Sequence, residues 1–127
     1  MKRLSLFKGK RKTQFEHNKF LVQVQTNESA SFIIKYPRKD YSPRIDECTS
    51  TYWERTLHVL KSKPLFVEVF VTNPTAVKKL VCTIQMDELN ADDEIIHTVT
   101  HSFNVPLKLD DWKWQRFELK SKLDYAE

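Results

Sequence analysis

Two histidines, His97 and His101, lie four residues apart and form the clearest pair of metal-binding side chains in the chain. On a helix this spacing would place both imidazoles on one zinc ion. The flanking residues 95–99 are rich in β-branched side chains, however, and predict a strand. On a strand the two rings share a face but lie roughly 13 Å apart, at ~3.3 Å of rise per residue, so we expect no shared metal ion.

The acidic run Asp92-Asp93-Glu94 is the other group of potential metal ligands, and we interpret it as a charged turn. The chain has one glycine, Gly9, whereas phosphate-binding loops and dinucleotide fingerprints need several glycines at fixed spacing. No arrangement of nucleophile, base and oxyanion donor stands out in the sequence. We therefore expect a protein that is not an enzyme and that uses no metal, cofactor or small-molecule substrate.

Trp112 and Trp114 lie two residues apart and are followed by Arg116, so a strand would place all three on one face. Such a face could stack a sugar or a base. We favour the alternative that the two indoles stabilise the fold, with one closing the core and the other covering the sheet edge. Asp110 and Asp111 predict a turn before the tryptophans, and we expect exposed residues from Asp110 to Trp114 to take part in binding.

Residues 37–50 form the longest irregular segment, and loops of this length are often functional. Basic and aromatic residues alternate in Lys35–Tyr41, which is a weak signature of nucleic-acid binding. A solvated loop is the simpler interpretation. The residues in it that we expect to contact a partner are Arg38, Lys39 and Tyr41.

The strongest local signal is the basic N-terminus. Residues 1–20 carry seven bases and one acid, a charge of +6, whereas the rest carries fourteen bases and sixteen acids, a charge of −2. The charge suits an anionic lipid surface, a nucleic acid, the tubulin surface or nuclear import, and a disordered solubilising tail is the alternative. We expect residues 1–16 to be flexible and to bind through Lys2, Arg3, Lys8, Lys10, Arg11 and Lys12.

Six runs of alternating apolar residues supply the elements that would position these side chains. The runs are Phe20–Val24, Ser31–Tyr36, Leu65–Val71, Leu80–Met86, Ile95–Phe103 and Trp112–Leu119. Turns rich in Asn, Asp, Pro and Ser separate them, at Thr26–Ser29, Thr72–Thr75, Asn90–Asp93 and Asp110–Asp111. Helical periodicity is visible only over Tyr52–Leu60. The pattern predicts an all-β fold, an antiparallel β-sandwich with at most one short helix.

The composition is that of one ordinary globular domain. The chain has 127 residues, of which 40% are hydrophobic and 30% charged, with a net charge of +4. We expect a single domain over residues 17–127, no secretory signal and no span across a bilayer. Cys48 and Cys82 form no CxxC pair, so they predict free thiols in a reducing compartment, the cytoplasm or the nucleus.

Three segments resemble a known family. Val22–Pro37 resembles an early segment of the cilia- and flagella-associated domain of the axonemal inner junction, since both run from an alternating strand through Thr-Asn and Ser to an aromatic, an isoleucine and a proline. Pro64–Val71 is similar to that family's central apolar strand. Pro106–Trp112, with Phe117 and Leu119, is similar to its late motif. The resemblance implies a β-sandwich that packs against tubulin and neighbouring proteins in ciliary or centriolar microtubules, without catalysis or cofactor.

A second class of function fits the first twelve residues. Their basic and apolar side chains together suit a peripheral-membrane or viral matrix-type assembly protein, because each base near an anionic surface contributes ~1 kcal/mol. A microtubule component would bind mainly through its folded body. A matrix-type protein would bind through its N-terminal segment and self-associate through its body. The sequence leaves the oligomeric state open.

Overall fold

The computed structural model describes residues 17–38, 42–60, 65–73, 79–105 and 112–119. These ranges form six strands and no helix: β1 (His17–Pro37), β2 (Pro43–Leu60), β3 (Phe66–Thr72), β4 (Leu80–Leu89), β5 (Ile95–Val105) and β6 (Trp112–Glu118). All pairs are antiparallel, in the order β5-β4-β1-β3-β6, and β2 pairs with the opposite edge of β1. The predicted all-β antiparallel fold is confirmed.

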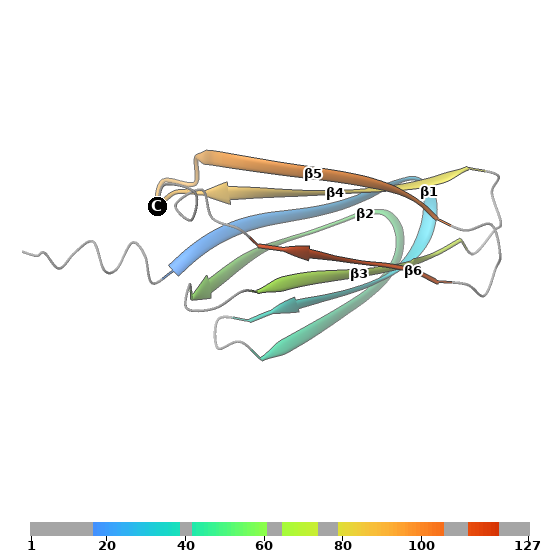
Figure 1. Cartoon of the computed structure of the whole chain (residues 1–127), viewed down its shortest axis with the longest axis horizontal. Coiled ribbons are helices and arrows are strands. Elements are labelled where there is room, and N and C mark those ends of the chain that lie inside the picture. The colour runs from blue at the N-terminus through green and yellow to red at the C-terminus, as the bar shows by residue number, and fades with distance from the viewer. Residues whose placement is uncertain (1–16, 39–41, 61–64, 74–78, 106–111, 120–127) are drawn as a thin grey trace, which may run out of the picture.

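Strand β1 organises the whole sheet. Its residues 19–26 pair with β4, and its residues 31–35 pair with β3. Between these two stretches the register against β2 shifts, and the strand bends. The sheet therefore curls into two half-sheets that face each other (Figure 1). One contains β5, β4 and the first half of β1, and the other contains β6, β3 and its second half.

The bend in β1 is held by side chains that replace missing sheet hydrogen bonds. The Asn27 amide donates to the Lys79 carbonyl at 2.8 Å, and its oxygen accepts from the Val81 N–H, also at 2.8 Å. The Thr26 hydroxyl donates to the Glu28 carbonyl at 2.6 Å. The turn predicted at Thr26–Ser29 is thus a bulged bend inside one strand, because Asn27 keeps the chain bonded to β4 while its direction changes.

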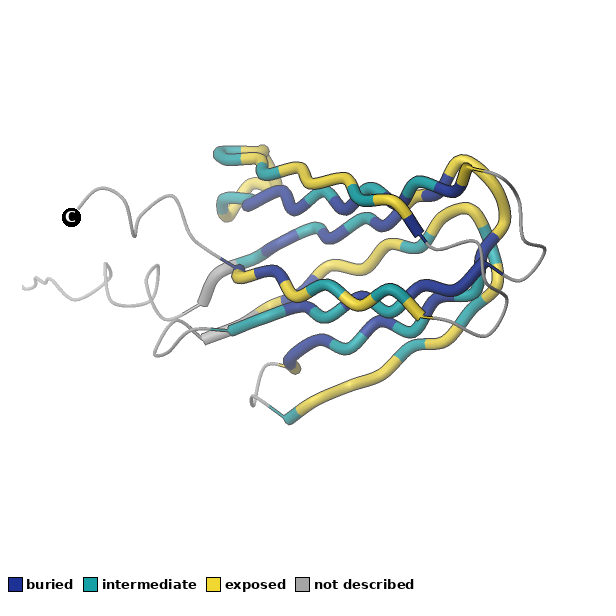
Figure 2. The backbone as a smooth tube through the Cα atoms, turned by 45° about the vertical axis from the view of Figure 1, so that its right-hand side comes forward, coloured by how far each residue is buried: buried dark blue, intermediate teal, exposed yellow. Residues whose placement is uncertain are grey.

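The core lies between the two half-sheets and is built from the apolar residues at alternate positions of each strand. Figure 2 shows buried and less buried residues alternating along β1 and β4. Predicted core residues that are at most 5% exposed are Phe20, Val22, Val24, Val67, Val69, Val71, Leu80, Cys82, Ile84 and Met86. Phe32, Ile34 and Tyr36 continue the stripe into the second half of β1.

Strand β2 contradicts two expectations. The loop predicted over residues 37–50 is wrong beyond residue 42, because Pro43–Ser50 pairs with β1. Helical periodicity over Tyr52–Leu60 is also misleading, since these residues continue the same strand. The long apolar stripe of β1 offers a partner over its whole length, and sheet pairing overrides local propensity. The short connection is closed by the Arg38 N–H, which donates to the Ser42 carbonyl at 2.9 Å.

The two outer strands of the curled sheet contact each other through aromatic side chains. The Phe117 ring of β6 lies 5.2 Å from the His101 ring and 6.3 Å from the Phe103 ring of β5. The predicted stripe Ile95–Val99–Phe103 is wrong at Ile95, which is 58% exposed. A bulge beside Leu89 shifts the register at that point, so only the later residues of β5 face the core.

The turn predicted at Asn90–Asp93 is confirmed. The Asn90 side-chain oxygen accepts hydrogen bonds from the N–H groups of Asp92 and Glu94, both at 2.9 Å. Asp93 has φ of 63°, a left-handed conformation that Asp tolerates better than most residues. The described ranges contain no helix long and apolar enough to cross a membrane.

Candidate functional site

The outer surface of β3 and β6 carries two exposed tryptophans. Trp112 and Trp114 are 45% and 49% exposed, and both point away from the core. The favoured interpretation, that one indole closes the core, is wrong. Because neighbouring strand residues face opposite sides, the buried Phe117 and Leu119 place both tryptophans outside. The sequence already contained this information, because Trp112 and Trp114 lie odd numbers of positions away from Phe117 and Leu119.

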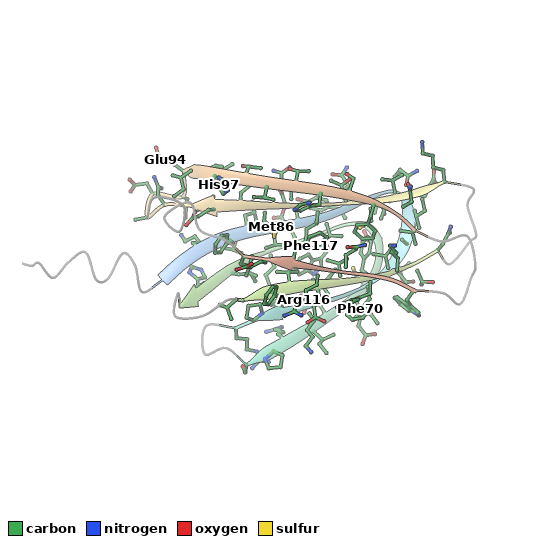
Figure 3. The ribbon with its side chains drawn as sticks, in the orientation of Figure 1. Phe70, Met86, Glu94, His97, Arg116 and Phe117 are labelled. Carbon is green, nitrogen blue, oxygen red and sulfur yellow. The ribbon has the colours of Figure 1, made fainter. Side chains whose placement is uncertain are left out.

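Contacts hold this outer surface in one arrangement. The Trp114 ring lies 6.2 Å from the Phe70 ring, and its indole N–H donates to Glu68 Oε1 at 3.4 Å. The Arg116 guanidinium lies over the Phe66 ring, 3.8 Å from its centroid. Figure 3 labels Phe70 and Arg116 on these two strands. We call this surface the aromatic face; it consists of Phe66, Phe70, Trp112, Trp114 and Arg116.

A hollow adjoins the aromatic face at Trp112. It has a volume of about 420 Å³, and its lining includes Ser31, Ile33, Thr49 and Thr72. Trp112 pairs with Thr72, which pairs with Ser31 on the next strand, so the hollow crosses the half-sheet from β6 to β2. A space of this size beside an exposed indole can accept side chains from another molecule.

A polar cluster occupies the opposite rim, where the two halves of β2 approach each other. Asp46 lies at its centre. Its carboxylate accepts hydrogen bonds from the Tyr36 hydroxyl at 3.0 Å and from the Trp53 indole N–H at 3.2 Å. It also pairs with Arg44 Nε at 3.6 Å and with Arg55 Nε at 3.3 Å.

The surroundings of Asp46 shift two pKa values. Burial alone would raise the pKa of Asp46, but the bonds from Tyr36 and Trp53 and the charges of Arg55 and Arg44 outweigh it and lower the pKa below its ordinary value. Burial raises the pKa of Tyr36, and its hydrogen bond to Asp46 raises it further. The cluster therefore favours an ionised Asp46 beside a neutral phenol.

Beside this cluster lies a cavity of about 350 Å³. Its lining includes Tyr36, Arg38, Arg44, Arg55 and His58, and we call it the arginine pocket. The Arg55 guanidinium lies 5.6 Å from the centroid of the Tyr36 ring. Three guanidinium groups at one cavity create a positive site for an anion.

The predicted site residues fall into three groups. Trp112 and Trp114 lie on the aromatic face, and Arg38 lines the arginine pocket. Trp112 is level with Ser31 in the sheet, whereas Arg38 follows the other end of β1, so the structure does not bring them together. The remaining predicted residues lie outside the described ranges: Lys2, Arg3, Lys8, Lys10, Arg11, Lys12, Lys39, Tyr41, Asp110 and Asp111.

Sequence reasoning missed Arg44, Asp46 and Arg55. They lie in a segment interpreted as loop and helix, although Arg44 and Asp46 alternate with the outward Ile45 as strand residues do. It also missed Phe66 and Phe70, whose outward direction follows from the buried valines between them. For Arg44, Asp46 and Arg55 the strand itself was not predicted, whereas for Phe66 and Phe70 the strand was predicted but its outer face was not considered as a binding surface.

The histidine pair lies on β5, as the strand prediction required. His101 stacks on the Phe117 ring. Among the residues that the structure describes, no three His, Cys, Asp or Glu side chains are placed to hold one metal ion. The expected absence of a metal in the whole protein stays a prediction.

Comparisons with known proteins leave the resemblance to the cilia- and flagella-associated domain as a prediction. No family model matches the chain, and neither the curated proteins nor the solved structures give a significant match.

Proposed function

We propose that this chain is a non-enzymatic binding domain that docks through its aromatic face onto an acidic protein surface. The observation that carries the proposal is the exposure of Trp112 and Trp114 on a strand whose Phe117 is buried in the core. Tryptophan and arginine dominate the binding energy of protein interfaces, and this face offers both. Flexible surface side chains would lose entropy on binding, whereas the Trp114 ring is already held by Phe70 and Glu68.

The charge of the chain supports an acidic partner. Residues 1–20 carry a charge of +6 and can add a long-range attraction to contacts made by the aromatic face. The microtubule lattice is the specific partner that we propose, since the family resemblance and this charge both favour it. Trp112 also belongs to the motif that carries the resemblance.

Sedimentation of the full chain with stabilised microtubules tests the proposal. Removing an anchor residue at an interface centre costs about 2 kcal/mol or more, so we expect Trp114→Ala to weaken binding roughly 30-fold. Tyr52→Ala is the matched control, because Tyr52 is 41% exposed but lies on the other half-sheet. Equal binding by the Trp114→Ala variant and the control would contradict docking through the aromatic face.

A parallel assay with anionic liposomes separates the second class of function. Replacing Lys8, Lys10, Arg11 and Lys12 with Gln removes most of the charge of the N-terminal segment. Microtubule binding that survives this change but depends on Trp114 supports the proposal. Liposome binding that vanishes with the four bases, together with no microtubule binding, would replace it with the matrix-type function.

A further inference from the structure

We propose that the arginine pocket is a second binding site, specific for a small phosphate-bearing anion. It lies at the free rim of β2, whereas the aromatic face lies on β3 and β6. Its volume of about 350 Å³ is within the range of small-ligand sites. The proposal does not depend on the function assigned to the aromatic face.

Among the described residues around the pocket, positive charge exceeds negative charge. Arg38, Arg44 and Arg55 carry three positive charges, whereas Asp46 is the carboxylate that contacts two of them. Two other acids of β2, Glu47 and Glu54, pair with outward-facing residues of β1, namely Ile33 and Gln23, and so lie on outer faces of the sheet. None of the described residues that line the pocket is acidic.

The geometry of the arginines leaves donors for a ligand. Arg44 and Arg55 both reach Asp46 through Nε. A guanidinium has five N–H donors, so a contact through Nε uses only part of its donor capacity. A guanidinium presents its donors as a planar fork that matches two oxygens of a phosphate. The carboxylate of Asp46 already occupies one side of Arg44 and Arg55. A phosphate has more oxygens than a carboxylate, so it can accept from donors of several arginines at once.

The pocket is organised before any ligand arrives. Asp46 holds Arg44 and Arg55 from one side, and the Tyr36 ring lies beside Arg55. Tyr36 is itself 3% exposed and bonded to Asp46. Because Asp46 restrains Arg44 and Arg55, binding would cost less side-chain entropy than at arginines without a carboxylate partner. Asp46 thus acts as a positioning residue, and the arginines contact the anion.

Isothermal titration of the full chain with inorganic phosphate and with inositol trisphosphate tests the site. Loss of a charge-assisted hydrogen bond costs about 1.5–3 kcal/mol, so Arg55→Gln should weaken binding roughly 10- to 100-fold. Arg38→Gln should weaken it as well. Arg38 has no ion pair among the described residues, so this variant still decides the matter if Arg55→Gln fails to fold. Arg116→Gln is the matched control from the aromatic face.

The N-terminal bases need a separate control, because they can attract phosphate without a pocket. All titrations are repeated with Lys8, Lys10, Arg11 and Lys12 replaced by Gln. We expect binding to remain and to depend on Arg38 and Arg55. Binding that disappears with the N-terminal bases, or that ignores both pocket arginines, would overturn the proposal.

The source of the phosphate is decided by a vesicle arm. Vesicles containing phosphatidylinositol bisphosphate are compared with vesicles of equal charge made with phosphatidylserine. Arginine-dependent preference for the phosphoinositide supports a lipid headgroup, and binding of free inositol trisphosphate alone supports a soluble ligand. Absence of binding to every phosphate probe would overturn the site. Trp114→Ala should leave phosphate binding unchanged, which separates this test from that of the proposed function.

Discussion

Asp46 shows how one carboxylate can organise a rim of the molecule. Four side chains contact it: Tyr36, Trp53, Arg44 and Arg55. They come from β1 and from both halves of β2, so the cluster ties the two half-sheets together. Removing the charge would leave two arginines at the cavity without their carboxylate partner.

The lowered pKa of Asp46 predicts a defined dependence of stability on pH. A carboxyl group whose folded pKa is depressed stabilises the fold fully above its unfolded pKa of about 3.9, and this contribution is lost as pH falls through the folded value. Asp46→Asn should therefore lower the free energy of unfolding near neutral pH, and the difference from wild type should shrink below about pH 4.

Urea unfolding across this pH range provides the measurement. Asp92→Asn is the matched control, because Asp92 is exposed in the β4–β5 turn and its side chain takes no part in the Asp46 cluster. A difference between Asp46→Asn and wild type that stayed constant down to pH 2 would contradict this account.

The two free cysteines should differ in reactivity. Cys82 is 0% exposed, and burial raises its pKa to about 12. Burial also raises the pKa of Cys48, with a further contribution from the charge of Asp46, but Cys48 is only half-buried. Thiolate is the reactive form, so a thiol reagent at pH 8 should label Cys48 slowly and Cys82 only after unfolding. Mass spectrometry of labelled peptides checks this, and rapid native labelling of Cys82 would contradict it.

At the scale of single elements, the bend in β1 depends on Asn27. Its side chain makes two hydrogen bonds to the start of β4. Asn27→Ala would remove both hydrogen bonds, at a cost of about 0.5–1.5 kcal/mol for each, because the freed groups are exposed to water. Chemical denaturation checks this, with Asn104→Ala as the control because Asn104 is exposed on β5. An equally small effect of both changes would show that the backbone alone sets the bend.

Strand β2 is long and has no described partner on its outer edge. Such edges invite pairing with other chains, and proteins protect them with proline and charge. Pro43 begins the strand, and Arg44, Glu47 and Glu54 follow along it. These residues therefore suit a strand at the edge of a sheet.

At the scale of the whole molecule, closure depends on Phe117 at the rim where β5 and β6 meet. Phe117→Ala should lower the free energy of unfolding by about 3–5 kcal/mol, because it removes a buried ring that contacts both half-sheets. Trp114→Ala on the same strand should cost less than about 1 kcal/mol, since Trp114 is half exposed. Urea unfolding of the two variants checks this contrast, and a similar loss in both would contradict the division between core and binding face.

Much of the fold was readable from local pattern. The stripes Leu65–Val71 and Leu80–Met86 predicted buried strands, because strict alternation of apolar residues is typical of a strand with one face in the core. Strand β2 was not readable, since Arg44, Asp46 and Arg55 occupy inward positions that apolar residues usually fill. These charged residues can stand at inward positions because they pair with one another across the rim.

The sequence by itself determined the fold class, the strands with apolar stripes and the uneven charge of the chain. These properties can be read from short stretches of sequence. Alternation of apolar residues indicates the strands, and Asn, Asp, Pro and Ser indicate the turns between them. Tertiary structure decided that β1 bends instead of turning, that both tryptophans face outward together, and that Arg38 meets Arg44 and Arg55 at one cavity. Each depends on contacts between distant segments, and the energy of such contacts outweighs the preferences of any short stretch.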